Sequence, residues 1–508
     1  MTTLLLLLLC ALLGLLACRA CWRGCAKPRN FPPGPAWLPL LGCLAAFHRV
    51  HRRRGYMYLA FEELSRRYGP VLGLKMGRQR LVVVSGHELV REVLLRDEFT
   101  GRPNGFFFRA RSFGKELGVL FSDGPTWSQH RRFAVRHLRA FGFGQASMAR
   151  QLEREAGCLV DWLRRRAAAG PVPVQRAFDV AVLNSLWWMF AGHRFEHADR
   201  TLHDILRVVH EIFRLSDTVG GLMSHMPFLR HLAPGLTGYN EFMANMRRLW
   251  VFLEREIAEH EANMSGQPPR DLIDAFLVEI QRRGRSEPDS IFDRDNLLIL
   301  CLDLFLAGSK TTSDTLVNVF AFLALQPHWL RELQDQLDSV VGRHRPPSLA
   351  DLPALPKLEA FLAEAQRTLV MAPLGIPHRA VADVTLAGYS IPKDTVVLLN
   401  YHSVNMDEAH FAEPQEFRPQ RFIDDSGKFR AIGAAMPFGI GKRRCLGEGL
   451  ARSSLFLFFS YVIHYFDLKP SEAHGKPDLN GYDGFVISLK PYYLELTPRT
   501  DIASAFCD

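Results

Sequence analysis

The sequence contains no internal repeat, no low-complexity block and no long polar linker after residue 40. Its 508 residues would permit several domains, but these absences argue against a string of separate modules. Hydrophobic residues make up 48% of the chain and charged residues 23%, which is an ordinary globular composition. We therefore expect one large domain with a sizeable buried core.

Regularly paired cysteines are also missing. Five of the nine cysteines crowd the first 43 residues and the other four are scattered, whereas a disulfide framework shows paired spacing in a short secreted chain. This distribution predicts a reduced, cytosol-facing protein.

A dense basic tract is missing as well, although the formal net charge is +9. A nucleic-acid-binding protein would concentrate such charge in a tract or stripe, so we expect no nucleic-acid partner. The excess instead suits an anionic membrane surface or an acidic protein partner, besides its contribution to solubility.

The N-terminus lacks the basic residues that precede the apolar run of a secretory signal peptide. An uncharged apolar run covers residues 4–18, and Arg19 and Arg23 follow it closely. The positive-inside rule then keeps the rest of the chain in the cytosol. Residues 1–22 are predicted to form a transmembrane anchor, with a cleaved signal peptide as the alternative because short apolar runs are ambiguous.

Residues 23–40 are basic and then proline-rich. Proline lacks an N–H group and fixes φ, so we predict a stiff hinge here and a folded body over residues 41–508. Three cysteines near the anchor have C-x2-C-x3-C spacing but no obvious fourth ligand, which favours free or lipidated thiols over a metal site: Cys18, Cys21 and Cys25.

The body is predicted to be mainly helical with a minor β region. Helical periodicities cover residues 147–168, 201–216, 239–264, 271–283 and 446–462, and β-like runs cover 71–76, 81–85, 395–399 and 484–489. One very long helix, apolar on nearly all sides, is expected from Phe292 to Gln326 and stops near Pro327. Such a helix runs buried through the middle of a large protein.

The loop before the last helix carries the most informative pattern. Two glycines precede Cys445 and one follows it, and a helix is expected to start directly afterwards. A thiolate needs electropositive surroundings to stay ionised at neutral pH, and a helix N-terminus and nearby arginines supply them. Glycines let backbone N–H groups approach the sulfur and let a flat macrocycle pass close to the chain. The pattern F-G-x-G-x-R-x-C-x-G is filled at every specified position between Phe438 and Gly447, which a lone incidental cysteine would not explain.

This pattern resembles the haem-ligand loop of the cytochrome P-450 superfamily, microsomal animal type, and the resemblance extends over essentially the whole chain after the anchor. It implies the cytochrome P-450 fold, mainly α with a minor β region, in a single haem-binding catalytic domain. The cofactor implied is haem (heme b, iron protoporphyrin IX), with Cys445 as the thiolate that binds the metal. Arg443 would bind a haem propionate, and Phe438 would pack beneath the ring.

Further segments match the same family. Trp127 and Arg131 fill its W-x-x-x-R pattern and, four apart on a helix, would project from one face toward a haem propionate. The segment around His378 resembles the strand that offers a histidine to a propionate. The family's structural triad, which holds the fold around the haem without being catalytic, is matched by three charged residues: Glu364, Arg367 and Arg421.

Inside the long helix, residues 307–312 (Ala-Gly-Ser-Lys-Thr-Thr) match the family's oxygen-activation site. That chemistry needs a local break in the helix, with room for dioxygen and an ordered water, and a hydroxyl that relays protons. Gly308 would allow the break and Thr311 would supply the hydroxyl, so these two are the candidate catalytic residues. Lys310 stands where the family usually carries Asp or Glu. This departure leaves open a haem-thiolate isomerase or dehydratase that does not use dioxygen.

The chain lacks the G-x-G-x-x-G motif, which fits delivery of NADPH electrons by a separate NADPH–cytochrome P-450 reductase. The resemblance places the anchor in the endoplasmic reticulum membrane, with the catalytic domain facing the cytosol. Basic residues near the thiolate and after Trp127 would form the docking face for the acidic reductase: Lys442, Arg443, Arg444, Arg131, Arg132 and Arg136.

The resemblance implies a monooxygenase that inserts one oxygen atom of O2 into a lipophilic small molecule. Residues 101–124 look similar to the arthropod enzymes that epoxidise methyl farnesoate in juvenile-hormone synthesis, which gives the sharpest substrate hypothesis. A generalist xenobiotic hydroxylase or a sterol hydroxylase of the same clan is the alternative. Apolar residues fall where the family places its pocket-lining loop, lid and helix: residues 106–108 and 119–121, Leu215, Leu222, Met223, Phe228, Leu304 and Ala307.

Overall fold

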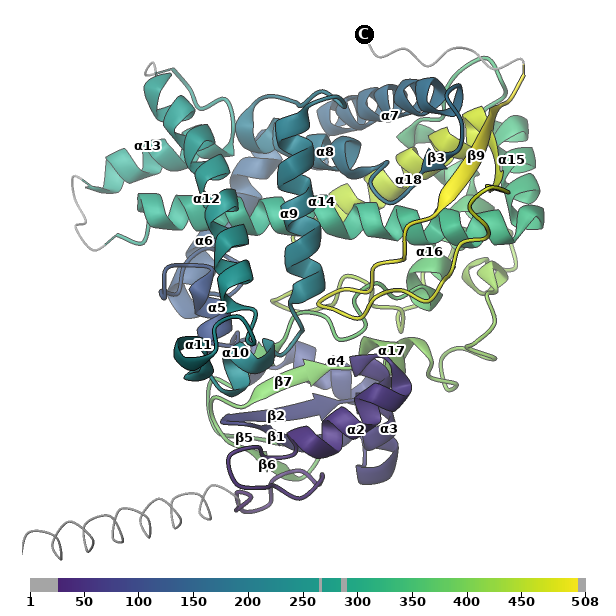
Figure 1. Ribbon diagram of the computed structural model, residues 1–508. Coiled ribbons are helices and arrows are strands. Elements are labelled where there is room, and N and C mark those ends of the chain that lie inside the picture. The colour runs from purple at the N-terminus through teal and green to yellow at the C-terminus, as the bar shows by residue number, and fades with distance from the viewer. Residues whose placement is uncertain (1–25, 265–266, 285–289, 501–508) are drawn as a thin grey trace, which may run out of the picture.

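The computed structural model describes residues 26–264, 267–284 and 290–500. In this part of the chain one long helix, α14 (Arg294–Leu325), crosses the middle of a helical body, and a small sheet lies at one end (Figure 1). The anchor predicted for residues 1–22 lies outside the described residues. Among the helices of the described part, none is both long enough and apolar enough to span a membrane.

Local sequence explains where α14 begins and ends. The Asp293 side chain accepts a hydrogen bond from the Asn296 N–H at 2.7 Å, and the helix ends before Pro327. Most of its side chains are buried, so the prediction of a long helix that is apolar on nearly all sides is confirmed.

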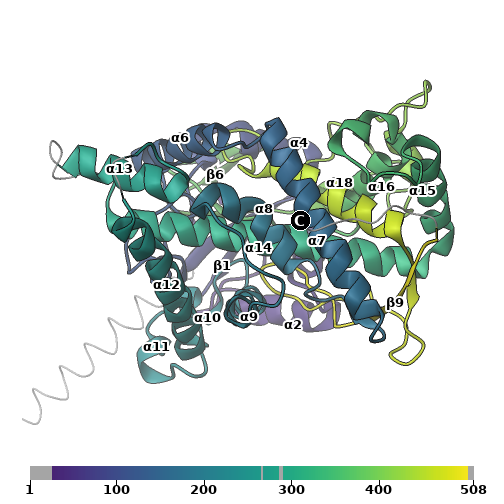
Figure 2. The same cartoon turned by 90° about the horizontal axis from the view of Figure 1, so that it is seen from above.

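Helices make up most of the rest of the described chain, as predicted. α8 and α18 lie between α14 and α7, as Figure 1 and the view from above in Figure 2 show. The helices predicted near residues 147, 201, 239 and 271 are α7, α9, α12 and α13, and each begins and ends within two residues of its predicted bounds. In chain order the α-helices besides α14 are α2 (Leu44–Arg54), α3 (Met57–Tyr68), α4 (His87–Leu95), α5 (Phe106–Ala110), α6 (Gly124–Ala140), α7 (Ala146–Ala167), α8 (Asp179–Ala191), α9 (Arg200–Leu215), α10 (Gly221–His225), α11 (Leu229–Leu232), α12 (Tyr239–Ala262), α13 (Leu272–Gly284), α15 (Pro327–Val340), α16 (Pro356–Thr368), α17 (Tyr401–Asn405) and α18 (Glu448–Tyr465).

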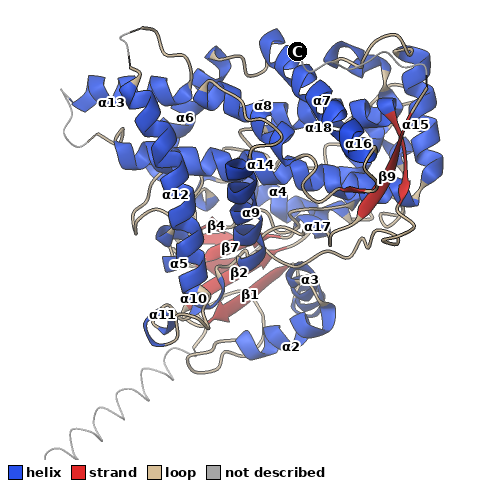
Figure 3. Cartoon of the chain, turned by 45° about the horizontal axis from the view of Figure 1, so that its top comes forward, coloured by secondary structure: helices blue, strands red, loops and turns tan. Residues whose placement is uncertain are grey.

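Strands gather in two places, one at the end of the body that carries α2 and α3 and one beside α15 (Figure 3). The larger sheet has the order β1–β2–β7–β4, in which only the β2–β7 pair is parallel. The smaller sheet has the order β3–β9–β8, and β5 and β6 form a hairpin. The strands are β1 (Val71–Met76), β2 (Gln79–Val84), β3 (Val172–Pro173), β4 (His378–Arg379), β5 (Val384–Leu386), β6 (Tyr389–Ile391), β7 (Val396–Leu399), β8 (Phe466–Pro470) and β9 (Tyr493–Pro498).

The strand expected over residues 484–489 is wrong. This segment is a loop with one isolated bridge, between Tyr482 and Ser488. The Phe485 N–H donates to the Phe213 carbonyl oxygen at the end of α9, at 3.1 Å. The backbone hydrogen bonds of the loop therefore go partly to a helix, which an alternating apolar pattern does not reveal.

The proline-rich segment packs on the larger sheet. Phe31 and Trp37 are buried, and the Gly73 N–H of β1 donates to the Pro33 carbonyl oxygen at 2.7 Å. A Cβ on Gly34 would lie 1.9 Å from the Gly73 oxygen, so this close approach requires glycine. Residues 31–37 thus belong to the packed body.

Three cysteines of the described part are free thiols: Cys43, Cys301 and Cys445.

Candidate active site

The loop of residues 436–447 places Cys445 just before the start of α18. The Cys445 N–H donates to the Phe438 carbonyl oxygen at 2.9 Å, which closes the loop. Gly439 and Gly441 have φ of 66° and 73°, in the left-handed region that favours glycine. A Cβ on Gly441 would also lie 2.2 Å from the Leu94 carbonyl oxygen at the end of α4. The glycines of the pattern are therefore required by backbone conformation and by close packing.

Two opposing sets of groups act on the pKa of the Cys445 thiol. Desolvation, the largest cause, and the Glu448 charge raise it, whereas the Gly447 N–H, Arg131 and Arg444 lower it. The arginines expected beside the thiol are therefore present and favour its ionised form. Coordination to a metal deprotonates a thiol outright, so the thiolate form depends on bound iron.

Trp127 and Arg131, both on α6, meet Arg443 of the cysteine loop. The Arg443 guanidinium lies 4.0 Å from the centre of the Trp127 ring, and that of Arg131 lies 6.0 Å from it. Arg131 donates to the Arg444 carbonyl oxygen at 2.7 Å, and Arg443 donates to the Thr100 carbonyl oxygen at 2.8 Å. The structure thus brings together three of the predicted propionate-binding residues.

His378 joins this group from β4. Its Nδ1 lies 2.8 Å from the Phe99 carbonyl oxygen, so Nδ1 carries the proton and Nε2 remains for another partner. Burial lowers the pKa of His378 well below its usual range, and the charges of Arg102 and Arg443 lower it further. The neutral imidazole is therefore favoured until an anion lies nearby.

Arg102 belongs to the same cluster, although the motif analysis did not select it. Its side chain is buried and donates to the carbonyl oxygens of Ile376 and Pro377, at 3.0 and 2.8 Å. No described residue accepts a hydrogen bond from its buried Nε. Desolvation lowers the pKa of Arg102 to about 10. In the sequence this arginine stands between Gly101 and Pro103.

The cluster fits a dianionic cofactor. Four side chains that can carry positive charge converge here: Arg102, Arg131, His378 and Arg443. The carboxylate of Asp123 lies 3.0 Å from Arg443, but it also forms an ion pair with Arg379. Desolvation, reinforced by the charges of Arg102 and Arg131, lowers the pKa of Arg443 to about 9. Buried cations in excess of their carboxylates are costly without a further anion. The two propionates of haem would supply that charge, and Cys445 would supply the ligand to iron.

One stripe of α14 is open, whereas the rest of the helix is almost completely buried. Ala307 is exposed, and Gly308, Thr311 and Thr315 are partly exposed. The Thr311 hydroxyl donates to the Ala307 carbonyl oxygen at 2.9 Å. α14 is assigned as one helix from residue 294 to 325, through the segment where a local break in hydrogen bonding is expected. Gly308 instead allows Leu186 of α8 to pack closely, since a Cβ there would lie 2.5 Å from Leu186 Cδ2.

Lys310 points away from this stripe. Its side chain is buried, forms an ion pair with Asp314 one turn later, and donates to the Ser488 hydroxyl at 3.0 Å. The Ser488 hydroxyl in turn donates to the Asp314 carboxylate at 2.8 Å. The lysine therefore ties α14 to the loop of residues 482–488.

The structural triad forms as the resemblance implied. Glu364 and Arg367 on α16 are both buried and form a two-point ion pair, with a shorter N–O distance of 2.7 Å. Arg421 donates to the Glu364 carboxylate at 3.1 Å. Arg367 also donates to the carbonyl oxygens of Asn405 and Pro414, at 2.7 and 2.8 Å, and so holds that segment in place.

The predicted apolar pocket residues do not all share one environment. Phe107 and Phe108 of α5 are buried in ring contacts with Phe242 and Phe121. Three candidate lid residues are exposed on the surface instead: Leu215, Leu222 and Phe228. Phe107 and Phe108 are thus part of the core, whereas these three lid candidates are exposed.

Comparison with known proteins agrees with this geometry. The cytochrome P-450 family model matches residues 32–496. A farnesoate epoxidase of Bombyx mori is 37% identical over 93% of this chain and 95% of its own length. A probable cytochrome P-450 303a1 of Drosophila melanogaster is 36% identical over 94% and 96%, respectively. Cytochrome P-450 2B2 of Rattus norvegicus is 34% identical over 96% and 98%.

The family model spans nearly the whole chain, and its match includes the cysteine loop, the basic cluster and the open stripe of α14. The alignments cover almost the full lengths of these relatives, so the similarity extends far beyond one motif. The chain therefore belongs to the cytochrome P-450 family, and it is a haem b-containing monooxygenase.

Proposed function

We propose that this enzyme epoxidises methyl farnesoate, using electrons that a separate NADPH–cytochrome P-450 reductase delivers. One molecule each of alkene, O2 and NADPH, with one proton, would give the epoxide, NADP+ and water. The farnesoate epoxidase of Bombyx mori, 37% identical over nearly the whole chain, supports this substrate. The single structural observation that carries the monooxygenase chemistry is the cation-rich cluster beside Cys445, which fits haem.

Each residue of the site has a distinct proposed role. Haem, when bound, supplies the oxidising chemistry that transfers one oxygen atom of O2 to the substrate. Cys445 would hold the iron, while Trp127, Arg131, His378 and Arg443 would bind the propionates, with Arg102 beside them. Phe438 would pack beneath the ring.

Thr311 is the proposed proton-handling residue. Its hydroxyl lies on the open stripe of α14 and donates a hydrogen bond to the Ala307 carbonyl oxygen. The hydroxyl oxygen can still accept a hydrogen bond from another group. Gly308 lets Leu186 of α8 pack closely against this part of the helix, since a Cβ there would lie 2.5 Å from Leu186 Cδ2. The alternative of an isomerase or dehydratase rested on Lys310, and the Lys310–Asp314 pair gives that residue a structural role instead.

The reductase would dock on exposed basic residues near the cysteine loop. Arg132, Arg136, Lys442 and Arg444 are exposed. Arg131 and Arg443, also proposed for docking, are directed inward, since the Arg443 side chain is only 5% exposed. The docking proposal therefore narrows to the four exposed residues, where charge would speed the encounter with an acidic partner.

Membrane attachment at the endoplasmic reticulum, through residues 1–22 and with residues 41–508 as the cytosolic catalytic domain, is the proposed localisation. Exposed leucines support it: Leu40, Leu232 and Leu236 are 71%, 77% and 75% exposed. Leu40 lies in one segment, and Leu232 and Leu236 lie in another. The loop after β1 contacts both segments, because the Gly77 N–H donates to the Leu41 carbonyl oxygen and the Arg78 N–H donates to the His225 carbonyl oxygen. Both segments lie at the same end of the molecule (Figure 1).

Two measurements test the proposal. The reduced carbon-monoxide difference spectrum of the membrane-expressed parent should show the red-shifted Soret band of a thiolate-ligated haem, and Cys445→Ala should lack it. With reductase and NADPH under 18O2, the parent should convert methyl farnesoate to an epoxide that contains one labelled oxygen. Turnover of methyl farnesoate no faster than that of unrelated lipophilic compounds would favour a generalist hydroxylase instead, and product without label would exclude monooxygenation.

A further inference from the structure

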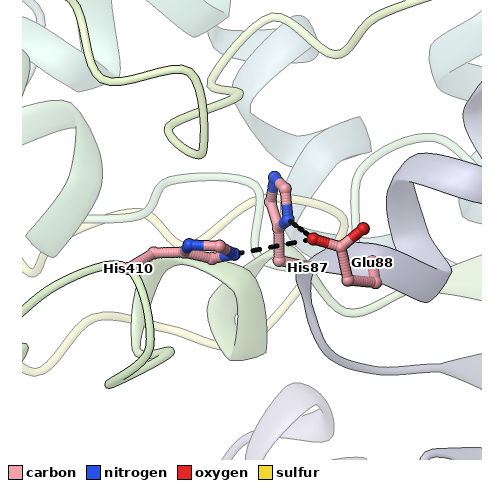
Figure 4. A group of neighbouring side chains, drawn as sticks. All are labelled: His87, Glu88 and His410. Carbon is pink, nitrogen blue, oxygen red and sulfur yellow. Dashed lines mark hydrogen bonds and ion pairs between the residues drawn. The ribbon is translucent and has the colours of Figure 1, made fainter.

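Three potential metal ligands meet on the surface, on elements that the proposed chemistry does not use. His87 and Glu88 lie in the first turn of α4, and His410 lies in the segment after α17. Figure 4 shows the two imidazole rings converging on the Glu88 carboxylate. One ligand atom from each residue lies within 4.8 Å of the others.

The distances suit one small cation. His87 Nδ1 and His410 Nε2 lie 3.0 and 4.0 Å from the same carboxylate oxygen of Glu88. Ligand atoms on a tetrahedral zinc ion, at about 2.0–2.1 Å from the metal, are roughly 3.3 Å apart. Small side-chain rotations would bring all three atoms to zinc, and Glu88 has the most freedom to move, since its side chain is 79% exposed, against 10% for His87 and 29% for His410.

A hydrogen bond alone accounts for only part of this arrangement. His87 can donate to Glu88, but 4.0 Å is too long for a hydrogen bond from His410. The two rings lie edge to face, with centroids 4.1 Å apart, so two protonated imidazoles here would repel each other. A divalent cation would use both nitrogen lone pairs and the carboxylate at once.

The backbone on both sides of the cluster is already fixed. The His410 N–H donates to the Asp407 carbonyl oxygen at 3.1 Å, and the next residue, Phe411, is buried beneath the Arg367 guanidinium at 5.0 Å. On the other side, the Gly86 N–H donates to the Ser403 hydroxyl at 2.9 Å, which joins the start of α4 to α17. Binding would therefore require little ordering of the chain.

Among the described residues, a second cluster of this kind consists of His260, Asp271 and Asp274, and it differs in one decisive respect. His260 already uses both ring nitrogens, with Nδ1 2.7 Å from the Glu256 carbonyl oxygen and Nε2 3.1 Å from Asp271. A ring that donates from both nitrogens has no lone pair for a metal. His87 Nδ1 and His410 Nε2 can each offer a lone pair when the ring is neutral and its other nitrogen carries the proton.

We propose that His87, Glu88 and His410 form a surface zinc site, separate from the haem. Imidazole and carboxylate ligands suit Zn2+, and three protein ligands leave a fourth position for water. Bound zinc would cross-link α4 to the segment after α17, which Arg367 of the structural triad holds. The site would thus stabilise the region between the larger sheet and the cysteine loop.

Zinc titration of the chelator-treated, full-length holoenzyme tests this site. The parent should bind one more Zn2+ per chain than His410→Gln or Glu88→Gln, or bind it at least tenfold more tightly, and His231→Gln, at an exposed histidine elsewhere, should match the parent. Zinc held by Cys18, Cys21 or Cys25 would be the same in all four proteins. The carbon-monoxide spectrum serves as the folding control.

Copper provides a second readout. Cu2+ bound at the site should show two nitrogen donors in its electron paramagnetic resonance spectrum in the parent and one in His410→Gln. Equal zinc binding by the parent and both variants, or a copper spectrum that His410→Gln leaves unchanged, would overturn the proposal.

Discussion

Lys310 and Thr311 are neighbours on α14, but their side chains lie in different environments. Lys310 is 2% exposed and paired with Asp314, whereas Thr311 lies on the open stripe of the helix. The residue that departs from the family pattern therefore acts on the side of α14 that faces the loop of residues 482–488. Lys310 contacts that loop through Ser488, and the proposed proton-handling hydroxyl of Thr311 stays on the open stripe.

Replacing Thr311 by alanine should uncouple electron use from product formation. NADPH consumption should persist, while product per NADPH falls by about tenfold or more, because general acid–base groups contribute factors of this size or larger. Without the hydroxyl, reduced oxygen should leave as hydrogen peroxide. Parallel assays of NADPH, epoxide and peroxide measure the effect, and tightly coupled turnover by Thr311→Ala would refute the role of this residue.

Replacing Lys310 by methionine should lower the stability of the enzyme and leave the coupling of electron use to product formation nearly unchanged. Product per NADPH should stay within about twofold of the parent, but stability should fall by about 3–5 kcal/mol because Asp314 is left as an uncompensated buried charge. Removing both charges, in Lys310→Met/Asp314→Leu, should restore much of that loss. Thermal unfolding measures stability here, and uncoupled turnover by the double variant would show that Lys310 takes part in proton delivery.

Arg102 should be needed to retain haem. The Arg102→Met variant removes a buried cation from the cluster, so haem should dissociate about tenfold faster, as expected for loss of a charge-assisted hydrogen bond of about 1.5–3 kcal/mol. Transfer of haem to an excess of a haem-scavenging protein gives the rate. Arg109→Met, on the neighbouring helix α5 and paired with Glu116, is the matched control and should behave like the parent.

Sequence patterns predicted the elements whose causes are local. The long helix follows from its apolar residues, its Asp293 cap and Pro327, and the cysteine loop follows from glycines that its backbone requires. Arg102 could not be selected from sequence patterns, because its place in the basic cluster comes from contacts with distant residues. The fold brings it to the Ile376 and Pro377 carbonyl oxygens and near His378.

Two further features depend on environment and not on pattern. The raised pKa of Cys445 comes from desolvation, which spacing along a sequence does not measure. Lys310 could not be interpreted without Ser488, which lies 178 residues away and accepts a hydrogen bond from it. Motifs thus specified the residue types of the site, while burial and distant partners determined their electrostatic state.

The exposed arginines of α6 should control association with the reductase. Arg132→Glu and Arg136→Glu should raise the reductase concentration needed for half-maximal turnover several-fold at low salt, with the difference shrinking as ionic strength rises. The haem spectrum should not change. Arg247→Glu, at an exposed arginine of α12, controls for the change in net charge, and an equal effect of this variant would argue against a docking face on α6.

His260 should make stability depend on pH in the neutral to alkaline range. Burial lowers its pKa, but hydrogen bonds to Asp271 and to the Glu256 carbonyl oxygen, with the charges of Asp271 and Asp274, raise it to about 9. A folded-state pKa above the unfolded value of about 6.5 means that this stabilisation is fully present below pH 6.5. It is lost as the pH rises through about 9, because the folded protein then gives up the proton that holds the pair together.

The shift corresponds to a stabilisation on the order of 3 kcal/mol at low pH. The thermal unfolding temperature of the parent should therefore fall between pH 6.5 and 9.5 more steeply than that of His260→Gln, because the variant has no imidazole proton to lose in this range. Below pH 6.5 the variant should be the less stable of the two, and above pH 9.5 the curves should converge. Parallel curves across this range would show that the His260–Asp271 pair does not carry its charge in the folded enzyme.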